Sequence, residues 1–138
     1  MMPTVSSLSI ADTSGHYLRA PQAVERPDIH AFDATSRPWF IHQGDVGIFS
    51  RYTQPYTDFF TKQQTVTLSK PVISADGKLK GTLAFHFDLA AMSHTLRQMK
   101  SPVHGEFFVV NRQGLALLHP DSGKLFQTVV SDKLLTGM

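Results

Sequence analysis

The stretch that decides the fold is Leu79-Lys80-Gly81-Thr82-Leu83-Ala84-Phe85-His86-Phe87-Asp88. Large apolar residues hold most of its odd positions, and small or polar residues hold the even positions from Thr82 onward. Successive side chains of a strand point to opposite faces, so this alternation predicts a β-strand with one apolar face. We expect the apolar face to lie on the core. The opposite face either leaves space for a ligand or is a solvated sheet face.

A second strand is expected just before this stretch. Residues 65–73 are β-prone, and Asp76-Gly77 supplies the turn that joins them to the next strand. This strand also carries small hydroxyl side chains at alternate positions, namely Thr65, Thr67 and Ser69. Two adjacent strands with small side chains on one side favour the ligand-site interpretation of that face.

Local patterns predict the remaining N-terminal elements. Residues 5–20 indicate a hairpin around the turn residues 12–15, and residues 21–32 indicate a loop. Ser36-Arg37-Pro38 fits the start of a short helix, with Ser36 as N-cap and the proline in the first turn. Residues 47–52 are expected to form a further strand.

The C-terminal third combines a helix with a second hairpin. Apolar residues recur at helical spacing before Pro102, namely Leu89, Met92, Leu96 and Met99. Residues 106–118 then repeat the strand, turn, strand pattern. Together these elements predict an α+β fold, an antiparallel sheet of five strands with helices at its faces, followed by a hairpin.

The two hairpins match each other in sequence. Residues 8–15 and 107–114 align without gaps, and Pro21 and Pro120 follow at the same offset. Such self-similarity indicates two copies of one module in tandem, with chance as the competing explanation. We therefore expect a complete module at residues 1–100 and the opening hairpin of a truncated second module at residues 101–138.

Composition excludes several classes of function. The chain has 138 residues, 41% hydrophobic and 17% charged, and a net charge of +2 with its basic residues scattered, which disfavours nucleic acid as a partner. It has no Cys, and its seven His include no i, i+4 pair, so neither a metal site nor a cofactor is expected. No nucleophile stands in a recognised catalytic motif. A binding domain, not an enzyme, is therefore predicted, and it has no apolar run long enough to cross a bilayer.

Four segments together resemble a known family. Arg37-Pro38-Trp39-Phe40, Tyr56-Thr57-Asp58, residues 65–72 and residues 81–88 are similar in order and spacing to the double Cache sensors. The resemblance implies a PAS-like ligand-binding module of a bacterial chemoreceptor, histidine kinase or diguanylate cyclase. It also implies a periplasmic or extracellular location in an inner-membrane receptor, with membrane segments outside this chain, an amino acid or organic acid as ligand, and a homodimer.

The resemblance assigns roles to individual side chains. Arg37 and Trp39 match positions that hold a ligand carboxylate, Asp88 matches the position that receives a ligand ammonium, and Tyr56 matches an aromatic pocket residue with Asp58 nearby. On this basis the guanidinium and the Asp88 carboxylate should converge on one cavity. The candidate ligand-binding residues are Arg37, Trp39, Phe40, Phe32, Tyr56, Asp58, Thr67, His86 and Asp88.

Departures from the family pattern and simpler roles leave alternatives open. Phe32 and Phe40 stand where the amino-acid-binding subgroup has tyrosines, which removes two hydroxyl donors and puts affinity for a standard amino acid in doubt. Arg37 fits a surface position, Trp39 a core position, and Asp88 the N-cap of the helix that follows it. For the whole domain, the alternatives are a ligand-free dimerisation or spacer module and, less favoured, a small metal-dependent enzyme.

Overall fold

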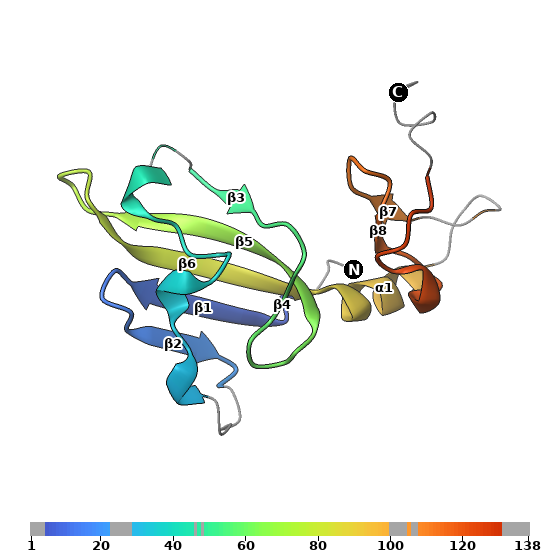
Figure 1. Cartoon of the computed structure of the whole chain (residues 1–138), viewed down its shortest axis with the longest axis horizontal. Helices are drawn as coiled ribbons and strands as arrows, with labels where there is room; N and C mark the ends of the chain where they lie inside the picture. The colour runs from blue at the N-terminus through green and yellow to red at the C-terminus, as the bar shows by residue number, and fades with distance from the viewer. Residues whose placement is uncertain are drawn as a thin grey trace. The chain divides into compact units, whose positions relative to one another are not determined.

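A computed structural model describes residues 5–22, 29–45, 47, 49–99, 105 and 108–130. The chain divides into two compact units, one ending at Asp88 and one beginning at Leu89 (Figure 1). The α-helix that follows Asp88 belongs to the second unit, and the expected module boundary at residue 100 stays a prediction. The units are described separately below.

The first unit is built around a six-stranded antiparallel sheet, which confirms the predicted fold class and adds one strand (Figure 1). The strand order is β2-β1-β6-β5-β3, and β4 also pairs with β5, at the first residues of that strand. The strands are β1 (Ser7–Asp12), β2 (Tyr17–Ala20), β3 (Arg51–Tyr52), β4 (Tyr56–Thr57), β5 (Gln64–Ile73) and β6 (Leu79–Asp88). The expected strand at residues 47–52 is limited to its last two residues among those described.

The register of the central strands aligns their small residues. Thr67 of β5 lies opposite His86 of β6, and on the other side of β6, Ser9 of β1 lies opposite Ala84. The alternation of side chains then puts one continuous row of small and polar groups on a single face. Its members are buried, namely Ser7, Ser9, Ala11, Thr65, Thr67, Ser69, Thr82, Ala84 and His86.

The predicted orientation of the sheet is wrong. The small, polar face is the buried one, with Thr82 and Ala84 fully inaccessible, so a solvated polar face is also excluded. The apolar face of β6 is only partly buried at Phe85, and in the neighbouring β1 Ile10 is 44% exposed. The reason is that small side chains let another layer approach closely, and in this chain an aromatic segment packs on that side.

The covering layer comes from the segment between β2 and β5. It contains the 3-10 helices η1 (Ile29–Ala31), η2 (Ala34–Ser36) and η3 (Gln43–Asp45), and it contributes Trp39 and Phe40 to the core against Ala11 and Ala84. The buried backbone N–H of Ile41 donates to the Thr82 hydroxyl at 2.9 Å. This bond fixes the height of the layer above the sheet.

The short helix before Arg37 is placed differently from the prediction. Asp33, not Ser36, is the N-cap, and its carboxylate accepts from the backbone N–H of Thr35 at 2.9 Å. The helix ends at Ser36, and Arg37 has extended backbone angles. The cause is Pro38, because a proline disfavours the helical conformation in the residue before it.

The second unit contains α1 (Leu89–Gln98), β7 (Val109–Val110), β8 (Ala116–Leu118) and the 3-10 helix η4 (Ser122–Lys124). The predicted helix and the predicted hairpin are both confirmed, while residues 106 and 107 of the expected first strand lie outside the described residues. The Ser93 hydroxyl of α1 accepts from the backbone N–H of His119 at 3.3 Å, just beyond β8.

The two hairpin turns share their hydrogen bonds as well as their sequence. Asp12 Oδ1 accepts from the backbone N–H groups of the second and fourth residues after it, and Asn111 Oδ1 does the same. Gly15 and Gly114 end the turns with φ values of 91° and 79°, in the region that favours glycine. This likeness supports the proposal that the second hairpin repeats the first.

Candidate functional site

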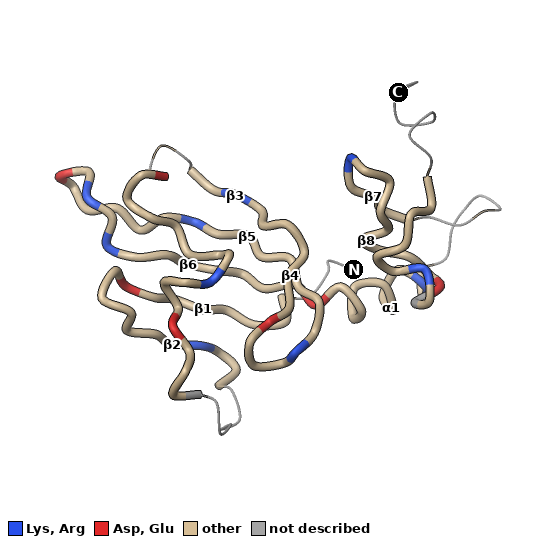
Figure 2. Tube along the Cα trace, in the orientation of Figure 1, with Lys and Arg blue, Asp and Glu red and all other residues tan. Residues whose placement is uncertain are grey.

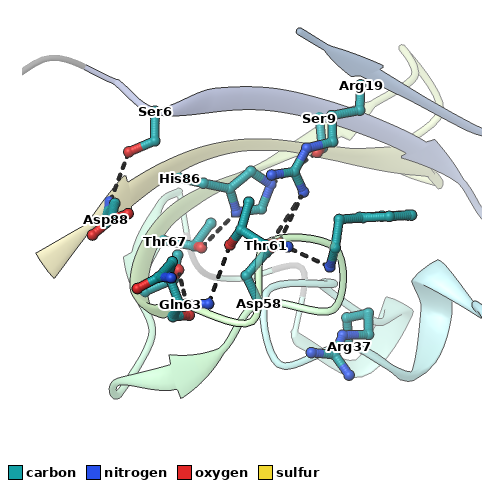
Figure 3. Close-up of polar contacts among 12 residues, drawn as sticks. Ser6, Ser9, Arg19, Arg37, Asp58, Thr61, Gln63, Thr67, His86 and Asp88 are labelled. Atoms are coloured by element: carbon teal, nitrogen blue, oxygen red, sulfur yellow. Dashed lines mark hydrogen bonds and ion pairs between the residues drawn. The ribbon is translucent and has the colours of Figure 1, made fainter. Parts of the chain in front are cut away.

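The centre of the buried polar face is a hydrogen-bonded group of four side chains, Ser9, Tyr56, Thr67 and His86, here called the His86 cluster. Figure 3 shows three of them, Ser9, Thr67 and His86. His86 Nδ1 lies 2.8 Å from the Thr67 hydroxyl and 3.1 Å from the Tyr56 hydroxyl, and Nε2 lies 2.8 Å from the Ser9 hydroxyl. The Tyr56 and Thr67 hydroxyls are 2.6 Å apart. Side chains from β1, β4 and β5 thus meet at the imidazole of His86 on β6.

The cluster is uncharged at neutral pH. Burial, and then the positive charge of Arg19, lower the pKa of His86 to about 4, although Asp58 acts in the opposite direction. Burial raises the pKa of Tyr56 to about 12. A neutral imidazole has one donor and one acceptor nitrogen, so both of its nitrogens can be satisfied by the hydroxyls around it.

A buried ion pair lies beside the cluster. Arg19 Nη1 is 3.1 Å from Asp58 Oδ2, and the two side chains are 8% and 5% exposed. The Asp58 carboxylate also accepts from the backbone N–H groups of Phe60 and Thr61, at 3.0 and 2.8 Å. Burial alone would raise the pKa of Asp58, but the Thr61 N–H and Arg19 outweigh it and lower that pKa. Asp58 is therefore a charged, fully engaged carboxylate.

Arg37 presents a second guanidinium in this unit, and it has no carboxylate partner among the described residues. Its Nη2 donates to the backbone carbonyl of Thr57 at 2.9 Å. The guanidinium carbon lies 5.8 Å from the ring centre of Tyr56 and 5.9 Å from that of Phe59. The side chain is half-buried, and a guanidinium has five N–H donors, so Arg37 keeps donors for another group.

The aromatic candidates form the wall around the cluster. Trp39 is 2% exposed and meets the His86 ring edge-on, with 5.6 Å between centres. Phe40 is 3% exposed and belongs to the core. Phe32 packs against Tyr17, with 4.7 Å between ring centres. Trp39 is thus both a core residue and a neighbour of the polar His86 cluster.

Asp88 does not join Arg37. It shares a face with His86 but lies at the end of β6, opposite Thr65, and it is partly exposed. Its backbone N–H donates to the Ser6 hydroxyl at 2.7 Å. Figure 3 shows Arg37 and Asp88 at opposite ends of the group, with His86 between them. The two side chains expected to converge are therefore separated, and a ligand contact by Asp88 stays a prediction.

Sequence reasoning missed two functional neighbours of His86. Ser9 contacts Nε2 of His86. Arg19 pairs with Asp58, and its positive charge helps to lower the pKa of His86. Both residues lie on the buried face of the first hairpin. A signal was available for Ser9, since the alternating small residues of β1 repeat the pattern noted in β5 and β6. No local pattern singled out Arg19, which lies in β2.

Other kinds of site find no support in the part of the chain that the structure describes. The positions of Lys and Arg are interspersed along the described chain with those of Asp and Glu and form no continuous stretch of one sign (Figure 2). Within the described ranges, no group of three or more His, Cys, Asp or Glu side chains could hold a metal ion. None of the described helices combines the length and the apolar character needed to cross a bilayer.

The chain matches no protein-family model. It is 30% identical over 109 residues to the methyl-accepting chemotaxis protein McpC of Bacillus subtilis, covering 74% of this chain and 16% of that protein. Among solved structures, it resembles the ligand-binding domain of the Pseudomonas fluorescens chemoreceptor CtaA in complex with L-alanine, with a TM-score of 0.70 and 28% identity, over 91% of this chain and 52% of that one.

A second solved structure is similar to the chain to about the same degree. The ligand-binding domain of the Pseudomonas aeruginosa chemoreceptor PctC, in complex with GABA, gives a TM-score of 0.70 and 26% identity over 91% of this chain and 54% of that one. The chain thus spans about half the length of these domains and a small part of its curated relative. Its fold and sequence agree with the resemblance found in the motifs, and the chain is similar to the Cache-type ligand-binding domains of bacterial chemoreceptors.

Proposed function

We propose that the chain is the extracytoplasmic ligand-binding module of a bacterial receptor and that it binds a small carboxylate between Arg37 and the His86 cluster without converting it. The single observation that carries the proposal is the guanidinium of Arg37, which has no carboxylate partner among the described residues and lies beside a buried group of neutral hydrogen-bonding side chains. The relatives support it, because the solved domains that the chain resembles hold L-alanine and GABA.

The chemistry of the site suits a carboxylate. A guanidinium recognises a carboxylate through two parallel hydrogen bonds, which is the geometry that a planar anion needs. The Arg37 guanidinium lies over the rings of both Tyr56 and Phe59, and these contacts limit its freedom. In addition, the buried hydroxyls of Ser7 and Ser69, on the same face as His86, have no hydrogen-bond partner among the described residues. They can donate to, or accept from, the uncharged part of a ligand.

Binding would act on the receptor by shifting a conformational equilibrium. A ligand moves such an equilibrium only as far as its affinities for the two states differ. Arg37 follows a short 3-10 helix in the covering layer, and His86 lies on the sheet. A ligand that joins the two would favour the state in which layer and sheet are close.

A thermal-shift screen of organic acids and amino acids tests the proposal. A ligand present at 100 times its dissociation constant should stabilise the domain by about 2.7 kcal/mol. Arg37→Gln should abolish the stabilisation. Arg97→Gln removes the same charge from an exposed position on α1 and should leave it intact. A complete absence of stabilising compounds, or equal responses from the two variants, would contradict a carboxylate site at Arg37.

An association module is the second candidate function, and the apolar face of the sheet favours it. On that face Leu18 is 73% exposed, and Leu8 and Ile10 are 38% and 44% exposed. Apolar patches of this kind mark surfaces that contact another chain, including a second copy. Sedimentation velocity would measure a concentration-dependent dimer, which Leu18→Ser should weaken. Dimerisation with no ligand response would favour this role over sensing.

A further inference from the structure

The described ionisable side chains around the His86 cluster carry a surplus of positive charge. Arg19 and Asp58 neutralise each other, His86 is neutral, and Arg37 has no described carboxylate partner. Among the residues that the structure describes there, Asp58 is the one carboxylate, and both of its oxygens are occupied by Arg19 or by backbone N–H groups. Asp88 lies farther away, at the partly exposed end of β6.

This distribution of charge discriminates between the two ends of an amino acid. The carboxylate of an amino acid would meet Arg37, but its ammonium would face a neutral imidazole, hydroxyl groups and the Arg19 guanidinium. A charge buried without a counter-charge is strongly unfavourable. An ammonium that took Asp58 as its partner would have to displace Arg19, leaving that cation buried and unpaired.

An uncharged group on the ligand fits the same surroundings. Tyr56, Thr67 and Ser9 present hydroxyls, and a hydroxyl can act either as donor or as acceptor. A ligand hydroxyl or keto oxygen could exchange hydrogen bonds with them at no cost in buried charge. The site therefore has a counter-charge for one end of a small acid and neutral hydrogen-bonding partners for the other.

We infer that the ligand is a small carboxylic acid without an amino group, a 2-hydroxy or 2-keto acid, and not an α-amino acid. The inference rests on the proposed function and names the ligand class of that site. It differs from what the solved relatives hold, which are L-alanine and GABA. The difference is carried by His86, whose neutral ring occupies the centre of the polar face where an ammonium would need an anion.

Matched ligand pairs test the inference by isothermal titration calorimetry on the full chain. The pairs are glycolate with glycine, L-lactate with L-alanine, L-2-hydroxyisocaproate with L-leucine, and L-malate with L-aspartate, which differ only in hydroxyl against ammonium. At least one hydroxy acid should bind ten times more tightly than its amino acid. Equal or tighter binding of the amino acids overturns the inference but leaves the proposed function standing. Binding by neither series overturns both.

Variants at the centre of the site give an independent readout. His86→Asp puts an anion where the imidazole lies and should reverse the preference within each pair, whereas His86→Gln stays neutral and should keep it. Far-ultraviolet circular dichroism establishes that each variant is folded, and His86→Gln carries the test if His86→Asp is not. A His86→Gln protein that prefers amino acids overturns the inference.

The carboxylate of Asp88 is the other anion that could hold a ligand ammonium. Its removal therefore tests whether amino acids bind through it. If Asp88→Asn specifically weakens amino-acid binding while Asp76→Asn does not, Asp88 holds the ammonium and the inference is overturned. Asp76 lies in the exposed turn between β5 and β6, so it controls for loss of one negative charge. Unchanged selectivity in Asp88→Asn supports the inference.

Discussion

Acidification should destabilise the first unit through His86. In the unfolded chain this imidazole takes up a proton near pH 6.5, but in the folded state its pKa is about 4 because of burial and Arg19. Between these two values acid favours the unfolded state, which binds the proton, and below pH 4 both states are protonated and the loss stops. For these pKa values, lowering the pH from 7 to 5 removes about 2 kcal/mol of unfolding free energy.

The chain provides its own probe for this measurement. Trp39 is its single tryptophan, it is buried, and it meets the His86 ring. Urea unfolding followed by Trp39 fluorescence at pH 7, 6 and 5 therefore reports on the unit that contains the site. His86→Gln is the matched variant, because a glutamine amide still has a donor and an acceptor for the neighbouring hydroxyls but does not titrate.

The comparison of the two proteins isolates the contribution of His86. Other histidines and carboxylates titrate in both proteins, and their effects cancel in the difference. Wild type should lose about 2 kcal/mol more than His86→Gln between pH 7 and pH 5. If the two proteins lose the same amount, the imidazole is not held neutral by the fold, and the uncharged cluster described above is refuted.

Three further substitutions should lower the unfolding free energy measured in urea. Asp58→Asn leaves a buried guanidinium without its counter-charge and should cost about 3–5 kcal/mol, and a loss below 1 kcal/mol would show that the pair is solvated. Thr82→Val removes the acceptor for the buried N–H of Ile41 and should cost about 1–3 kcal/mol; an unchanged midpoint would mean that this N–H has another acceptor. In Gly81→Ala the new Cβ would collide with the backbone oxygen of Ala11, which should lower the unfolding free energy by about 1–3 kcal/mol. Wild-type stability in that variant would contradict the close approach of β1 and β6.

The elements fixed by local pattern were predictable. The alternation in residues 79–88 and the turn at Asp76-Gly77 located β6 and β5 within a residue of their ends, and the recurring apolar residues located α1. The same pattern could not tell which face of β6 is buried. That choice depends on the aromatic segment that packs on the sheet, and such packing is a contact between residues far apart in the chain.

The candidate site was predictable only in part, because some of its contacts join residues far apart in the chain. Tyr56, Thr67 and His86 were named as candidates, and the structure brings them into one hydrogen-bonded cluster. Arg19 was missed because its partner Asp58 lies 39 residues away, and no local motif joins them. The helix start was misplaced because Ser36 fits a cap as well as Asp33 does when the backbone is unknown.

The pairing of Arg19 with Asp58 also limits how the sequence can change over time. Loss of either partner alone strands a charge in the interior, whereas exchange of both for well-packed apolar residues is close to neutral in comparable cases. Natural variation at these two positions should therefore be correlated. In an alignment of this subgroup, positions 19 and 58 should be kept together or replaced together, and sequences with only one of the two charges should be rare.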